Sequence, residues 1–115
     1  MLIAYLGFRR EEMFAPVFSL LTFKTLDEAV FIANDHDFGL AASVFTRDTN
    51  AGFDLARRID AGMVHINGPT IHDSAQVPHG GWKKSGYGRF NGFEGLREFT
   101  QTKVITINEP HSFPI

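Results

Sequence analysis

Short apolar runs alternate with amphipathic segments along the first part of this 115-residue chain. Residues 16–24, 40–46 and 63–67 are short and largely apolar, as buried strands are. Between them, residues 25–37 and 48–61 carry apolar side chains at helical spacing. Strand, helix, strand, helix, strand is the order of a parallel sheet with right-handed crossovers. The sequence therefore predicts an α/β fold with a partial βαβαβ parallel sheet.

Polar residues mark where the two predicted helices begin. Thr25 and Glu28 have the spacing of a capping box, in which the hydroxyl accepts from a helix amide and the carboxylate reaches back. Asp48 or Thr49 is placed to cap the second helix. These local signals fix the starts of both helices.

The remainder of the chain predicts a long glycine-rich loop from residue 68, a short helix over residues 93–99 and a last strand over residues 102–108. Three buried parallel strands need cover on both faces, and two helices can hardly supply it. We therefore expect part of a larger α/β protein.

Composition and charge exclude several classes of function. The chain is 43% hydrophobic and 21% charged, which is typical of a soluble globular protein, and it has no cysteine. No disulfide, thiolate metal site or cysteine nucleophile is possible within it. A net charge of −2 without a basic stripe argues against nucleic acid. Twelve Phe residues indicate either a Phe-rich core or a subunit interface.

The first ten residues are apolar and then basic. That order is wrong for a secretory signal, and the apolar run is too short to span a bilayer. We expect a cytoplasmic protein that does not bind membranes.

Several motifs, in order, resemble the carboxy-terminal part of the aldehyde dehydrogenase superfamily. Residues 62–70 are a strand that ends in Asn67 and enters a loop. Residues 78–89 are similar to the family's Pro-Phe-Gly-Gly-x-Lys-x-Ser-Gly-x-Gly-Arg segment, and residues 95–107 to its final Gly-Leu-x-x-Tyr/Phe-Thr-x-x-Lys segment. The resemblance divides the chain into an unmatched segment (1–10), part of the catalytic domain (11–101), and an oligomerisation strand with its tail (102–115).

Glu11 to Val17 resemble the family's Glu-Glu-x-Phe-Gly-Pro motif, with Ala15 in place of the glycine. By that resemblance Glu12 accepts hydrogen bonds from the nicotinamide ribose hydroxyls, which suits an ionised carboxylate. Phe14 then packs near the nicotinamide ring. The cofactor implied is NAD or NADP in a full-length relative, and we expect this chain alone to bind none.

Residues 68–78 are similar to the loop of the vanillin and salicylaldehyde dehydrogenases, which share a His-Ile-Asn-Gly-Pro-Thr-x-His-Asp run. In the family this loop borders the substrate tunnel. The resemblance makes Ile71, His72 and His79 the candidates for its wall, with His79 where relatives have Phe. A surface turn is the other interpretation of His72 and Asp73.

The family's reaction uses a cysteine thiolate, which attacks the aldehyde while hydride leaves to the nicotinamide, and a glutamate-activated water, which hydrolyses the thioester. By resemblance, both groups lie in a part of the family's chain that precedes the segment matched here. No catalytic residue is therefore expected within these 115 residues. The implied partner is a further copy of the chain, bound through the last strand and the apolar faces.

Two alternatives stay open. One is a non-catalytic module that associates with itself or binds an intact subunit. The other is a small hydrolase or metal enzyme built on His65, His72 and His79, which recur every seven residues. We expect no metal site, because one of these histidines lies on a predicted strand and no cysteine or clustered carboxylates complete a ligand set.

Overall fold

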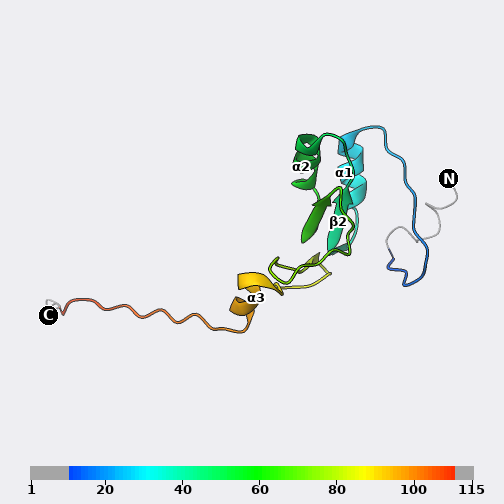
Figure 1. The fold of residues 1–115 in the computed structure, drawn as a ribbon. Helices are drawn as coiled ribbons and strands as arrows, with labels where there is room; N and C mark the ends of the chain where they lie inside the picture. The colour runs from blue at the N-terminus through cyan, green and yellow to red at the C-terminus, as the bar shows by residue number, and fades with distance from the viewer. Residues whose placement is uncertain (1–10, 111–115) are drawn as a thin grey trace, which may run out of the picture.

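The computed structural model describes residues 11–110 and shows a small α/β fold (Figure 1). Within residues 11–110, three helices and four short strands follow one another. In order, these elements are α1 (Leu26–Asn34), β1 (Phe38–Gly39), β2 (Ala41–Val44), α2 (Thr49–Ala56), β3 (Met63–Ile66), β4 (Trp82–Lys83) and α3 (Gly92–Glu98).

Strands β2 and β3 pair in parallel, in a register that runs from Ala41 opposite Met63 to Val44 opposite Ile66. Helix α2 connects them, so this part of the chain is one βαβ unit. Strands β1 and β4 form a separate antiparallel pair. Helices α1 and α2 lie next to each other at one end of the fold (Figure 1).

Both predicted helix starts are confirmed. The Thr25 hydroxyl accepts a hydrogen bond from the Glu28 amide at 3.2 Å, and the Glu28 carboxylate accepts from the Lys24 amide at 2.8 Å. Asp48 caps α2, because its carboxylate accepts from the amides of the second and third residues that follow, at 3.0 and 3.1 Å. The predicted short helix is also present as α3.

Two predicted strands are wrong. Residues 16–24 and 102–108 contain no strand in the structure, and in Figure 1 residues 101–110 run away from the rest of the fold. A strand forms only when a neighbouring strand accepts and donates its backbone hydrogen bonds. Among the described residues no strand pairs with either segment, so the βαβαβ sheet is reduced to a single βαβ unit.

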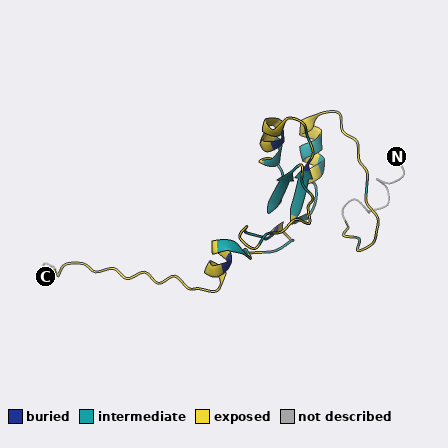
Figure 2. Ribbon diagram, in the orientation of Figure 1, coloured by how far each residue is buried: buried dark blue, intermediate teal, exposed yellow. Residues whose placement is uncertain are grey.

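The fold buries little apolar surface. Among residues 11–110, Val44 and Ala61 are the apolar side chains that count as buried, each 8% exposed, and Figure 2 shows exposed residues over most of the helices and the C-terminal extension. The chain exposes 10231 Å², whereas a compact protein of this size exposes roughly 6,300 Å². Its radius of gyration is 21.2 Å, against about 13 Å for a compact domain. The described residues therefore form little apolar core of their own.

Candidate functional site

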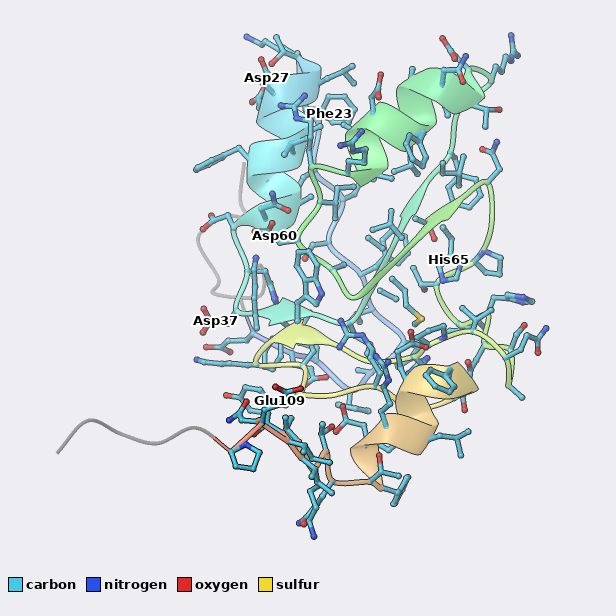
Figure 3. The ribbon with its side chains drawn as sticks, turned by 90° about the vertical axis from the view of Figure 1, so that its left-hand side faces the viewer. Phe23, Asp27, Asp37, Asp60, His65 and Glu109 are labelled. Atoms are coloured by element: carbon cyan, nitrogen blue, oxygen red, sulfur yellow. The ribbon has the colours of Figure 1, made fainter. Side chains whose placement is uncertain are left out.

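The loop that follows β3 folds back over that strand and encloses a hollow of about 370 Å³. His65 on β3 and His72 in the loop both line it, and their rings meet edge to face with centroids 6.3 Å apart. In Figure 3, His65 lies on the side of the fold away from α1. The other lining residues are Gly62, Met63, Val64, Asp73, Ser74, Val77 and Pro78.

The hollow combines apolar walls with a polar side. His65 carries a ring nitrogen, Nε2, that is buried without a hydrogen-bond partner among the described residues. The Ser74 hydroxyl lies 3.5 Å from Nε2 of His72. A volume of about 300 Å³ or more with a few convergent polar groups is typical of small-molecule sites. The hollow therefore has the size of a small-molecule site and a lining of mixed polarity.

The predicted wall residues are placed differently by the structure. His72 lines the hollow. Ile71 is 91% exposed and points to solvent rather than into it. His79 lies outside the lining, and its Nδ1 is 3.7 Å from the Asp73 carboxylate. Among the described residues, His72 and Asp73 thus line the hollow, His79 lies beside Asp73, and Ile71 stands apart.

A second set of contacts ties the loop to the start of α3. The main chains of His79 and Phe90 exchange hydrogen bonds of 2.9 and 2.7 Å. The Gly92 amide donates to the Ala75 carbonyl at 3.0 Å, and the Asn91 side chain donates to the Asp73 carboxylate at 3.0 Å. The loop is thus held at both ends, by β3 and by the turn before α3.

Asn67 and Ser43 fix the point where β3 enters the loop, and sequence reasoning assigned neither of them a role. Asn67 has φ 56°, and its side chain accepts from the Thr46 amide at 2.8 Å and donates to the Thr46 carbonyl at 2.9 Å. The Ser43 hydroxyl donates to the Gly68 carbonyl at 2.7 Å. The Asn-Gly pair was the available signal, because Asn and Gly both tolerate a left-handed backbone.

The predicted cofactor contacts lie elsewhere. Glu12 lines a separate hollow of about 500 Å³ beside β1, together with Lys84 and Ser85. Phe14 is 97% exposed, so the described residues leave its ring uncovered. The exposed Glu12 carboxylate thus borders a hollow of mixed polarity where it can accept hydroxyl hydrogen bonds, while Phe14 offers an uncovered ring.

The glycine-rich segment at residues 80–89 crosses beside the parallel strands, and the glycines make this close approach possible. A Cβ on Gly62 would lie 1.8 Å from the Gly80 carbonyl oxygen, and one on Gly39 would lie 2.4 Å from the Asp60 carbonyl oxygen. The Lys83 ammonium donates to the Asn34 carbonyl at 2.9 Å, at the C-terminal end of α1. The segment therefore joins α1, β1 and β3.

The three histidines do not gather at one point. His65 pairs with His72, whereas His79 lies beside Asp73. Among residues 11–110, no group of three or more His, Asp or Glu side chains is placed to hold a metal ion. In the same range, no helix is long and apolar enough to cross a bilayer.

The aldehyde dehydrogenase family profile matches residues 7–105. The chain belongs to the aldehyde dehydrogenase family.

Among its relatives, a vanillin dehydrogenase from a Pseudomonas species is 48% identical over 107 residues, which are 92% of this chain and 22% of that protein. A salicylaldehyde dehydrogenase from Pseudomonas putida is 46% identical over 97 residues, 84% of this chain and 20% of that protein. The chain thus spans about a fifth of the length of the curated relatives it matches.

Solved structures agree with the fold. The salicylaldehyde dehydrogenase of Pseudomonas putida G7, complexed with salicylaldehyde, superposes with a TM-score of 0.85 at 42% identity, over 93% of this chain and 22% of that one. An NAD-dependent aldehyde dehydrogenase from Sinorhizobium meliloti gives a TM-score of 0.86 at 43% identity, over 96% of this chain and 22% of that one.

Proposed function

We propose that this chain is the carboxy-terminal part of an NAD- or NADP-dependent dehydrogenase of aromatic aldehydes, and that it supplies one wall of the substrate site. The observation that carries the proposal is the hollow beneath the loop after β3, lined by His65 and His72. Relatives named for vanillin and salicylaldehyde support the substrate class. Ile71 and His79 belong to the same loop region, where the rest of an enzyme covers them.

Glu12 and Phe14 are the residues that hold the nicotinamide end of the cofactor in this proposal. The Glu12 hollow fits that role, because a carboxylate accepts hydrogen bonds from two vicinal hydroxyls. The uncovered Phe14 ring offers a flat apolar surface to the nicotinamide. When bound, the cofactor supplies the hydride acceptor. Relatives of known structure include NAD-dependent enzymes.

By itself the chain does not oxidise aldehydes. The reaction of the family passes through a thioester, which only a cysteine can form, and the chain has none. A carboxylate such as Glu12 or an imidazole such as His79 does not replace that chemistry. The site is completed only when further protein brings a thiolate to the hollow.

Association with further protein is the second part of the proposal. The chain exposes about 3,900 Å² more than a compact protein of its size. Val104, Ile105 and Ile107 in the C-terminal extension are 78–93% exposed, and the rings of Phe31, Phe53 and Phe93 on the helices are 58–68% exposed. An extended apolar segment can pair with the edge of another sheet. We propose that residues 102–108 and the apolar faces bind the rest of a subunit and a second copy.

A self-associating or subunit-binding module without a role in catalysis is the second candidate, and the same exposed surface favours it. The activity of a chimeric enzyme distinguishes the substrate-wall function from the non-catalytic module. A chimera that carries this chain in place of the aligned residues of the Pseudomonas putida salicylaldehyde dehydrogenase restores aldehyde-dependent NADH formation if the chain forms a substrate wall. Binding to that enzyme without activity in the chimera supports the module and contradicts the proposed function.

A further inference from the structure

Asn91 occupies the N-cap position of α3 but does not cap the helix. Asparagine is among the preferred N-cap residues, because its side-chain oxygen accepts from a first-turn amide. Here Asn91 makes no such bond, and its amide nitrogen instead donates to the Asp73 carboxylate at 3.0 Å. The residue also has φ 61° and is followed by Gly92 with φ 58°. Because Asn91 does not make the usual N-cap hydrogen bond, its side chain is expected to serve a contact elsewhere in the fold.

The carboxylate that receives this bond lies between two parts of the site. Asp73 lines the hollow with His65 and His72. The oxygen that accepts from Asn91 is also the one 3.7 Å from Nδ1 of His79, a ring nitrogen that is buried without a hydrogen-bond partner among the described residues. Asp73 therefore faces the hollow on one side and the α3 turn on the other.

The backbone around Asp73 holds this geometry in place. His79 and Phe90 exchange two main-chain hydrogen bonds, and the Gly92 amide donates to Ala75. A Cβ on Gly92 would lie 3.0 Å from the carbonyl oxygen of Gln76, so the turn approaches the loop closely. Side-chain and main-chain contacts thus join the same two segments, residues 73–79 and 90–92.

We propose that Asp73 is a positioning residue for aldehyde binding, which, held by Asn91 and His79, fixes the loop and with it the His72 side of the hollow. It acts through its neighbours and has no role in the hydride or acyl steps. This proposal rests on the proposed function, because it assigns the same hollow to the aldehyde. The ligand class is an aromatic aldehyde with a ring hydroxyl, which matches the mixed polar and apolar lining.

The test uses the salicylaldehyde dehydrogenase chimera and steady-state kinetics with salicylaldehyde. We expect Asp73→Ala to raise KM about tenfold, the size of effect that a displaced pocket contact produces, while kcat stays within about twofold because the reacting groups are untouched. Asp73→Asn is expected to keep KM close to that of the unmodified chimera, because its amide oxygen still accepts from Asn91. The matched control is Asp27→Ala, which removes a carboxylate on α1, far from the loop. That carboxylate pairs with Arg58.

A second variant separates the loop contact from the stability of α3. Asn91→Gly tolerates both the N-cap position and the left-handed backbone of residue 91, but it has no side chain to reach Asp73. We expect it to reproduce the KM rise of Asp73→Ala with an unchanged thermal unfolding midpoint. The positioning role is overturned if the variants have the same KM as the unmodified chimera. It is also overturned if kcat and the unfolding midpoint fall along with the change in KM, because the variants then act through the stability of the fold. An unmodified chimera without turnover instead overturns the proposed function, so the two failures are distinguishable.

Discussion

The side chain of Asn67 is expected to protect the Thr46 amide from hydrogen exchange, and removing that side chain should speed exchange at this amide. The Thr46 amide donates to Asn67 Oδ1 at 2.8 Å, and the Thr46 carbonyl accepts from Asn67 Nδ2 at 2.9 Å. A hydrogen bond of this kind contributes about 1 kcal/mol net, so its loss should speed hydrogen exchange at Thr46 roughly fivefold. The backbone of Asn67 is left-handed, with φ 56°. This conformation costs a residue such as Ala about 1–2 kcal/mol.

Three variants separate these two effects. Asn67→Gly loses both hydrogen bonds, at about 1–2 kcal/mol in total, but tolerates the backbone. Asn67→Ala loses the same bonds and adds about 1 kcal/mol or more of backbone strain. Asn67→Asp keeps the acceptor for the Thr46 amide and loses only the donor.

The assay is amide hydrogen exchange of the purified chain, followed residue by residue by NMR. The expected order of Thr46 exchange, from slow to fast, is wild type, Asn67→Asp, Asn67→Gly and Asn67→Ala. Equal exchange at Thr46 in wild type and Asn67→Gly would refute the reasoning, because that amide would then owe its protection to something other than the side chain.

Two further predictions concern the scaffold. Gly62→Ala should lower the free energy of unfolding by about 2–3 kcal/mol, because the new methyl group would lie 1.8 Å from the Gly80 carbonyl oxygen. Urea titration measures this loss, with Gly68→Ala as the control, where the nearest atom is 3.6 Å away. Similar unfolding midpoints for the two variants would contradict the close approach. Thr25→Ala should destabilise α1 by about 1 kcal/mol, whereas Thr25→Ser keeps the hydroxyl that accepts from the Glu28 amide. We expect faster amide hydrogen exchange in α1 for Thr25→Ala and not for Thr25→Ser. Equal exchange rates in the two variants would argue against the cap.

The parts of the fold predicted correctly are those that depend on neighbouring residues. Thr25 and Asp48 cap their helices through contacts within three positions, so the sequence window contains the whole cause. The β2–β3 pairing also follows from local pattern, because a βαβ unit needs only one helix between its strands.

The wrong or missing elements depend on distant parts of the chain or on further protein. Residues 16–24 and 102–108 have strand-like composition, yet a strand requires a partner, and the described chain offers none to either segment. Strands β1 and β4 were not predicted, since each has two residues and their pairing joins positions more than 40 residues apart. Composition alone carries no information on such long-range pairing.

The site shows the same division. Of the two loop residues that the motif named, His72 lines the hollow and Ile71 points to solvent, because the direction of a loop side chain depends on the turn geometry. The contact between Asp73 and Asn91 joins residues 18 positions apart through a left-handed turn. No spacing rule predicts such a contact.

The central claim is that this chain provides a substrate wall and no nucleophile, and one paired measurement of NADH formation from salicylaldehyde tests it most directly. The purified 115-residue chain, checked by mass for contaminating full-length enzyme, and the salicylaldehyde dehydrogenase chimera are assayed side by side. The account predicts no turnover by the chain alone and measurable turnover by the chimera. Turnover by the pure chain, or a correctly folded chimera without turnover, would contradict it.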